Sequence, residues 1–400
     1  MARFSADSEW RLGWRIAGAS AIANATGISL LFYSFSLFIK PMEADFGLTR
    51  GQAGVVQSLV IMAALGAPVI GRLVDRTGFH LMFLACTLGM VAVEVGLARW
   101  GNGFGAMALG TALIGFIGGG SSTVLLTRPI SAHFVRWRGF AFGCVGVGIS
   151  ITTLFVPRWL EGVIATDGWR QGYYMLAIIA LVIGLPLVLM LMPRSASVRG
   201  DAAAAGPIDR AFLRSRDFWL ITAAGVLTNL ATSGVIGQLS PMLQESGLAP
   251  RDAALGITTF AVGQFFGKLG GGWLLDRYDP RIVAAAFTVS ATGSFVLFLI
   301  AGPVLGILLC ATALLGLLQG ADVSIFSYFI ARRFPISQYG TIFGAMHGIG
   351  WIGTAASLVG YGASFGYAHG YWLAQSVAIG LLVLSAGVIM MIRFPDADRA

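Results

Sequence analysis

Long apolar segments alternate with short polar ones along the whole chain of 400 residues. Each apolar segment is close to the roughly 20 residues that a helix needs to cross about 30 Å of hydrocarbon. The pattern therefore predicts an all-α integral membrane protein with about twelve transmembrane helices. The predicted spans are residues 16–39, 51–71, 80–98, 104–127, 139–160, 172–192, 217–243, 253–275, 282–301, 304–331, 340–365 and 371–392.

The composition agrees with a membrane protein. Hydrophobic residues make up 56% of the chain and charged residues only 11%, whereas a soluble domain carries about 25% charged residues. The 55 glycines favour close packing between helices in lipid. A few buried helices within a large soluble protein are the alternative, and a soluble core could not bury this much apolar surface.

The net charge of +8 raises the question of a nucleic-acid partner. With the N-terminus placed in the cytoplasm, most of the 26 Lys and Arg residues fall on the cytoplasmic side, as the positive-inside rule describes. We therefore predict a multi-pass inner-membrane protein with both termini cytoplasmic, whose partner is the lipid bilayer and not nucleic acid. The three cysteines lie inside predicted spans without metal-ligand spacing, so we predict no metal and no cofactor.

One motif occurs twice. The stretch Gly71-Arg72-Leu73-Val74-Asp75-Arg76 ends one apolar segment, and Gly272-Trp273-Leu274-Leu275-Asp276-Arg277 ends another at an offset of 201 residues. The same offset aligns Gly66 with Gly267, and it is half of the chain. The sequence thus predicts two pseudo-symmetric six-helix bundles, residues 1–193 and 217–400, joined by a cytoplasmic linker at 194–216. A duplicated membrane unit is typical of secondary transporters.

This arrangement resembles the major facilitator superfamily across nearly the whole chain. Gly71-x-x-x-Asp75-Arg76 is similar to that family's signature between its second and third helices, and Gly272-x-x-x-Asp276-Arg277 is a degenerate copy. The resemblance implies that both motifs act as gates, in which the aspartate meets a helix N-terminus and the arginine a facing carboxylate. Carboxylates are favoured at helix N-termini. The alternative is a tight, basic turn with no gating role.

Within the superfamily the chain is similar to the monocarboxylate transporter and oxalate/formate antiporter group. The similarity is carried by residues 32–38, by the following loop at 40–50, and by residues 137–143. The resemblance implies an arginine in the eighth helix that binds the substrate carboxylate, but this chain has Lys268 there. Lysine keeps the charge and loses the two-pronged guanidinium geometry.

Lys268 and Asp322 are charged residues well inside predicted spans. They lie roughly 12 Å and 15 Å from the cytoplasmic ends of their helices, where charges are costly and usually face a cavity or a partner. At the 201-residue offset they align with Ala67 and Ser121, so the fold does not require charge at either place. We predict that Lys268 binds an anion and that Asp322 carries a proton. A fixed ion pair between the two, or a Lys268 that extends to the interface, are the alternatives.

Polar residues accompany these charges. Gln264 stands one helical turn before Lys268, and Gln319 one turn before Asp322. His347 shares a helix face with Trp351 and titrates near neutral pH when unperturbed, so it is a candidate for both substrate contact and proton coupling. The predicted substrate-binding residues are Lys268, His347, Gln264, Tyr33, Asn229 and Gln319. Polar residues that merely hold helices together are the alternative for all of them.

The sequence therefore predicts a secondary transporter, and not an enzyme, that moves a small organic anion such as a monocarboxylate by proton symport with alternating access. Competition between the substrate carboxylate and Asp322 for Lys268 would couple the proton to the anion. One basic centre and one acid favour symport over anion exchange. A proton-driven exporter of cationic or amphipathic drugs, an anion exchanger, and a receptor or scaffold in a transporter fold are the alternatives. The resemblance implies a monomer.

Overall fold

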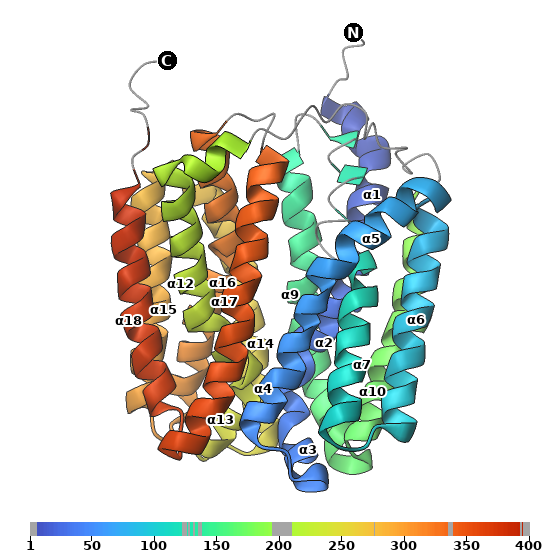
Figure 1. Ribbon diagram of the computed structural model, residues 1–400, viewed down its shortest axis with the longest axis vertical. Coiled ribbons are helices and arrows are strands. Elements are labelled where there is room, and N and C mark those ends of the chain that lie inside the picture. The colour runs from blue at the N-terminus through green and yellow to red at the C-terminus, as the bar shows by residue number, and fades with distance from the viewer. Residues whose placement is uncertain are drawn as a thin grey trace. The chain divides into compact units, whose positions relative to one another are not determined.

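The computed structural model describes residues 6–121, 126, 129–130, 133–134, 138–193, 210–275, 277–334, 339–392 and 394. Within these residues every regular element is a helix (Figure 1), which confirms the predicted all-α class. Ten described spans are long and apolar enough to cross a membrane, or eleven if the bent pair Glu9–Thr26 and Ile28–Leu37 is one span. The predicted span 253–275 corresponds to α14 (Pro250–Leu275), which has 26 residues and is not among them.

The chain divides into two compact units. The first comprises Met1–Leu48 and Leu59–Ala202, and the second comprises Thr49–Ser58 and Ala203–Ala400. The predicted second span is shared between them. Its first half, α4 (Arg50–Ser58), groups with the second unit, and its second half, α5 (Met62–Thr77), groups with the first. The 3₁₀ turn η2 (Leu59–Ile61) lies between these halves.

The first unit has a break in its first span. The sequence predicts one helix over 16–39, but α1 (Ala6–Thr26) ends before Gly27, and α2 (Ile28–Ser34) continues at an angle of 43°. The Ser121 hydroxyl accepts a hydrogen bond from the backbone N–H of Ile28 at 3.2 Å and so satisfies a donor at the start of α2. The remaining described elements of this unit are η1 (Phe35–Leu37), α3 (Ile39–Phe46), α6 (Phe79–Trp100), α7 (Gly103–Gly118), η3 (Gly119–Ser121), α9 (Arg138–Asp167), α10 (Trp169–Ile178), η4 (Ile179–Gly184) and α11 (Leu185–Leu191).

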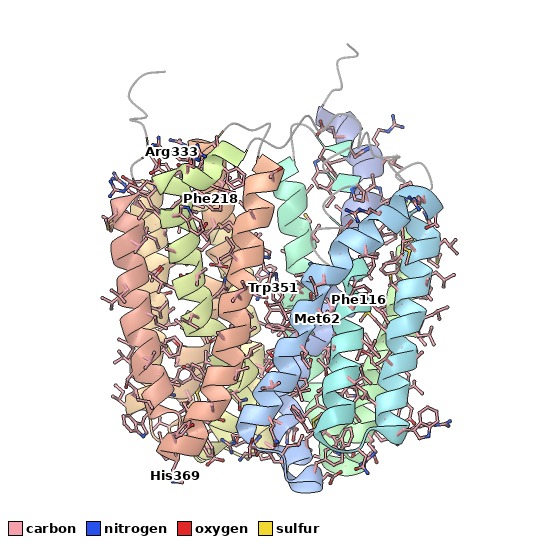
Figure 2. The ribbon with its side chains drawn as sticks, viewed as in Figure 1. Met62, Phe116, Phe218, Arg333, Trp351 and His369 are labelled. Atoms are coloured by element: carbon pink, nitrogen blue, oxygen red, sulfur yellow. The ribbon has the colours of Figure 1, made fainter. Side chains whose placement is uncertain are left out.

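In the second unit, charged residues stabilise helix ends. Asp217, in the first turn of its helix, pairs with Arg333 at the end of another helix, and Figure 2 shows Arg333 beside the labelled Phe218 and far from His369. Besides α4 and α14, the described elements are η7 (Arg210–Arg214), α12 (Arg216–Gly237), α13 (Leu239–Glu245), α15 (Pro280–Ile300), α16 (Leu305–Arg333), α17 (Tyr339–Ala368) and α18 (Trp372–Met391). Most of the predicted linker, residues 194–209, lies outside the described residues.

The two units repeat the same close helix crossings. A Cβ atom at Gly66 would overlap the backbone carbonyl of Phe116, and a Cβ atom at Gly267 would overlap that of Leu317. Each residue of the first pair aligns with the corresponding residue of the second pair at the 201-residue offset. Two further crossings obey it: Gly115 against Leu59 with Gly316 against Phe260, and Gly119 against Ala67 with Gly320 against Lys268. The duplication that the sequence predicts is therefore confirmed at the level of backbone contacts, where only glycine permits the approach.

Candidate functional site

A small pocket, with a cavity volume of about 10 Å³ and therefore room for about one water molecule, lies within the second unit between α12, α16 and α17. Its lining residues are Gly225, Asn229, Asp322, Val323, Phe326, Phe343, Met346, His347 and Gly350. Three residues that the sequence singles out, Asn229, Asp322 and His347, therefore meet in one place although they come from three different helices.

Asp322 is the acid of this pocket. It is 8% exposed, and its Oδ1 has no hydrogen-bond partner among the described residues. The aligned residue of the first unit, Ser121, accepts the backbone N–H of Ile28 at the break between α1 and α2. The residue that aligns with Ile28 is Asn229, which lies inside the unbroken α12, where backbone N–H groups bond within the helix. Asp322 consequently keeps an acceptor oxygen available to the pocket.

Aromatic rings form the α17 side of the pocket. The imidazole of His347 stacks on Phe343, with ring centroids 5.5 Å apart and planes inclined by 14°. Trp351 packs edge-on against His347 from the following turn, at 6.2 Å between centroids, and Figure 2 shows it between the two ends of α17. Residues four apart lie on one face of a helix, so these three rings form a continuous stripe.

Lys268 lies on a different side of α16. Its Nζ donates a hydrogen bond to Oε1 of Gln264 at 3.2 Å, and Gln264 is fully buried. The backbone of α14 at these two residues crosses α16 at Gly320. Asp322 is two residues beyond Gly320, about 200° around the helix. The crossing explains why the pocket-lining set contains Asp322 and contains neither Lys268 nor Gln264.

The remaining predicted binding residues lie elsewhere. Gln319 is half-buried on α16 and does not line the pocket. Tyr33 is on α2 in the first unit, where its ring meets Phe32 edge-on at 5.2 Å. The direct parts these two residues play in substrate binding stay predictions.

The predicted gating motifs are only partly visible. Gly71 is buried in α5 and Arg76 is exposed near its end, while Asp276 and the side chain of Asp75 lie outside what the structure describes. Arg277 places its guanidinium 3.9 Å from the ring centroid of Trp273. The gating role of both motifs stays a prediction.

A carboxylate close to the second motif does cap a helix. Asp279 precedes α15 and accepts the backbone N–H of Arg281 at 2.8 Å. Hydrogen bonds from the Arg281 side chain, which approaches to 2.8 Å, together with the backbone bond hold the pKa of Asp279 below its usual value. The helix N-terminus favours the ionised form in the same way.

In the second unit, a cluster of residues around the buried Arg50 has no counterpart in the predictions from sequence. Arg50, the first residue of α4 and only 7% exposed, donates to Glu245 at 2.5 Å and to the Tyr371 hydroxyl at 2.8 Å. Its guanidinium lies 3.6 Å from the ring centroid of Phe365, and the Tyr371 hydroxyl donates to Gln238 at 3.1 Å. We call these five residues the Arg50 cluster. Their positions are spread from residue 50 to residue 371, so no local sequence pattern indicates that they meet.

The chain is similar to curated transporters over most of its length. It is 25% identical to the probable nitrate/nitrite transporter NarK2 of Mycobacterium tuberculosis over 389 residues, which cover 93% of this chain and 94% of the relative. It is 25% identical to a gallate transporter of Pseudomonas putida, over 63% of this chain and 64% of the relative. It is also 25% identical to monocarboxylate transporter 11 of Mus musculus, over 68% of this chain and 60% of the relative.

The fold is shared with a solved structure and with a family model. The crystal structure of a bacterial homologue of the human lysosomal transporter Spinster superposes with a TM-score of 0.70 and covers 97% of both chains at 15% identity. The model of the Major Facilitator Superfamily matches residues 19–249, which is more than half of the chain. This multi-pass membrane protein therefore belongs to the Major Facilitator Superfamily.

Proposed function

We propose that the protein is a secondary active transporter that moves a small organic anion, a monocarboxylate, together with protons. Three lines support this proposal. The chain belongs to the Major Facilitator Superfamily, its relatives are named for nitrate/nitrite, gallate and monocarboxylate, and its second unit carries Lys268 and Asp322 within helices of the membrane domain. We place the protein in the inner membrane as a monomer with both termini cytoplasmic, because of its basic cytoplasmic segments and its resemblance to the superfamily.

The observation that carries the proposal is the buried Asp322, whose Oδ1 has no partner among the described residues and which lines a pocket. An anion entering beside an ionised carboxylate would bring two like charges together at low dielectric, which is strongly unfavourable. Protonation of Asp322 removes that repulsion. Anion binding and proton uptake therefore favour each other, and this is the linkage that symport needs.

Lys268 supplies the positive charge that holds the substrate carboxylate. Its hydrogen bond to the buried Gln264 orients the ammonium group, and Gln319, Asn229, His347 and Tyr33 complete the proposed binding set. The two units would alternate in exposing this set to either side of the membrane. The two motifs at Asp75-Arg76 and Asp276-Arg277 would act as the gates.

Uptake into proteoliposomes tests the proposal. The assay uses labelled lactate, pyruvate and larger carboxylates with an inward proton gradient, for the wild type, Lys268→Ala and Asp322→Asn. We expect the wild type to accumulate an acid against its gradient, Lys268→Ala to lose at least about tenfold of the rate because the anion loses its counter-charge, and Asp322→Asn to equilibrate the acid without accumulating it.

A matched control separates these effects from general damage. Asp252→Asn makes the same chemical change in the first turn of α14 and should transport like the wild type. If Asp322→Asn still accumulates the acid in response to the proton gradient, Asp322 is not the proton carrier. If the wild type accumulates no carboxylate, the proposed substrate class is wrong.

Proton-driven export of a cationic or amphipathic compound is the second candidate. The observation in its favour is that Asp322 shares its pocket with Phe326 and Phe343, since carboxylates and aromatic faces both attract cations. Under this alternative, Lys268→Ala changes selectivity among cationic compounds and does not abolish transport.

A further inference from the structure

We propose that Glu94 is a second proton-binding residue of the transporter, and that the hydroxyl group of Tyr173 stabilises its ionised form after the proton leaves. The inference rests on the proposed function, which gives the first proton to Asp322, and it adds a second proton carried by the other unit. It follows from two buried polar side chains of the first unit whose side-chain oxygens lack hydrogen-bond partners among the described residues.

Glu94 lies in α6 among mostly apolar residues. It is only 3% exposed, and its Oε2 has no hydrogen-bond partner among the described residues. An ionised carboxylate without a partner is strongly disfavoured in such surroundings, so the group takes up a proton. Acidic residues inside membrane helices are rare and by default functional. Glu94 therefore holds a proton in this conformation.

Tyr173 supplies the second polar group. It lies in α10, which packs against α6. Its side chain is fully buried, and its hydroxyl has no partner among the described residues. The ring is held by Phe38 and Trp169, with centroid distances of 4.7 Å and 5.9 Å. An electrostatic interaction links Tyr173 to Glu94, so the two groups belong to one polar site between α6 and α10.

This site lies near one end of the unit. Arg170, in the first turn of α10, donates a hydrogen bond at 3.4 Å to the carbonyl of Gly101, which follows α6, so these two helix ends meet. Tyr173 is about 6 Å and Glu94 about 9 Å along their helices from that end. A proton therefore has to cross only one or two helical turns between solvent and Glu94.

Few other ionisable groups belong to the elements around Glu94. Of the elements that pack against α6, the segments α7, η3, η4 and α11 carry no titratable side chain, and the charged residues of α5 lie near the opposite end of α6. The other titratable residues of α6 and α10 are His80, Cys86, Arg99, Arg170, Tyr173 and Tyr174. Among them, the Tyr173 hydroxyl is the buried donor that interacts with Glu94.

The unused hydroxyl of Tyr173 suits an ionised Glu94. A phenol can donate one hydrogen bond, and a bond to a charged carboxylate is about twice as strong as one between neutral groups. When Glu94 loses its proton, this donor can stabilise the charge directly or through one water molecule. The pair therefore has two states. A buried donor without a partner fits a neighbour that changes its charge better than one that stays neutral.

The aligned residues of the second unit show that packing does not require these groups. At the 201-residue offset, Glu94 aligns with Phe295 and Tyr173 with Ala374. Both aligned residues are buried, and their helices, α15 and α18, pack against each other as α6 and α10 do. Apolar side chains thus fill the same two places in the second unit. The acid and the phenol are a property of the first unit alone, which favours a functional role.

A second proton changes the charge that transport moves. One proton with one monocarboxylate is electrically neutral, whereas two protons carry a net positive charge that an inside-negative potential drives inward. In proteoliposomes with an inward proton gradient, we expect a potassium diffusion potential to raise accumulation of the transported acid at least about fivefold in the wild type. It should have no effect in Glu94→Gln, which keeps the shape and binds no proton. The control Glu161→Gln, on the half-buried side chain of α9, should respond like the wild type.

Infrared spectroscopy of the purified protein in lipid tests the inference without transport. The carbonyl band of protonated carboxyl groups is followed as the pH is raised. It should contain a titrating component that is absent in Glu94→Gln and present in Glu161→Gln. In Tyr173→Phe this component should persist to a higher pH, because the ionised form has lost its donor. Size-exclusion profiles check that each variant is folded, and Tyr173→Phe carries the comparison if Glu94→Gln is not.

The outcomes distinguish the two proposals. A wild type that accumulates an acid in response to the proton gradient, with no response to the potential, would overturn the inference while upholding the proposed function. A Glu94→Gln protein that still responds to the potential would also overturn the inference. If the wild type accumulates no carboxylate, the proposed function fails, and the infrared titration decides on Glu94 alone. A Glu94 component that does not change with pH would show that the residue is a permanently neutral part of the packing.

Discussion

At the residue scale, one aligned position carries different side chains in the two units and has a different role in each. Ser121 and Asp322 align in the two units, and the serine hydroxyl is used to hold the start of α2. Asp322 faces a helix whose backbone has no N–H to offer, because α12 has no break at the aligned position. The side chain at this aligned position thus satisfies a backbone donor at the start of a helix in the first unit. In the second unit it is an acid that faces a pocket.

A second carboxylate, Asp45, predicts a dependence of stability on pH. Asp45 accepts hydrogen bonds from the Trp169 indole at 2.7 Å and from Arg170 at 3.0 Å, and these contacts, the Trp169 bond first, hold the pKa of Asp45 below its usual value. Its folded-state pKa is therefore lower than the unfolded value of about 3.9. The stabilising contribution is complete above that value and is lost as the pH falls through the folded-state pKa.

We expect Asp45→Asn to lower the apparent melting temperature in detergent at pH 6, and the difference from the wild type to shrink as the pH falls towards about 3. The effect should be small because Asp45 and Arg170 are both partly exposed. Trp169→Phe removes the main hydrogen-bond donor to Asp45. Like Asp45→Asn, it should make the melting temperature less dependent on pH. A difference between wild type and Asp45→Asn that stays constant from pH 6 to pH 3 would contradict this account.

At the element scale, the crossing of α14 and α16 determines which charges can share a site. Gly320 lies so close to the backbone of Gln264 and Lys268 that a Cβ atom would come within 2.9 Å of the Lys268 nitrogen. The crossing places Lys268 on the α14 side of α16 and Asp322 on the α12 and α17 side. The distance between these two charges is consequently determined by helix packing and not by their spacing in the sequence.

We expect Gly320→Ala to destabilise the protein by about 1–3 kcal/mol, as overpacking of a close contact does, and to lower transport because α14 must shift together with Lys268. Gly306→Ala in the same helix is the matched control, since a Cβ atom there meets nothing within 4 Å and alanine is the better helix former. Thermal unfolding in detergent and proteoliposome uptake measure both effects. Equal behaviour of the two variants would show that the crossing tolerates a methyl group.

At the scale of the whole molecule, two similar units share one span. The chain divides between Ser58 and Leu59. The helix α4 is fastened to the second unit by close packing on α17 and by the Arg50 cluster, while α5 packs in the first. Arginine suits this position because its planar group can donate to Glu245 and Tyr371 while it lies over Phe365. Duplication of the unit explains the repeated glycine crossings, and the basic segments predict how the whole is oriented in the membrane.

The proposed orientation predicts which loops face the outside. In a variant without the three native cysteines, Asn102→Cys, in the exposed loop between α6 and α7, should react with a membrane-impermeant maleimide added to intact cells. Ser197→Cys, in the predicted linker, should react only after the membrane is opened. This difference follows from the excess of Arg on the side of the termini and the linker. Labelling of Ser197→Cys in intact cells, with labelling of Asn102→Cys only after the membrane is opened, would show that the topology is the reverse of the proposed one.

The sequence alone determined the membrane-spanning character of the chain, its duplication and the presence of the charges Lys268 and Asp322 within apolar segments. These properties are local or periodic, because apolar length decides whether a helix can span a membrane, a fixed offset reveals a repeat, and a charge among apolar residues stands out. Tertiary structure decided the break at Gly27, the pocket that unites Asn229, Asp322 and His347, and the Arg50 cluster. Each depends on partners from separate helices, and only the packing of those helices determines which polar groups find a partner and which remain available to a ligand.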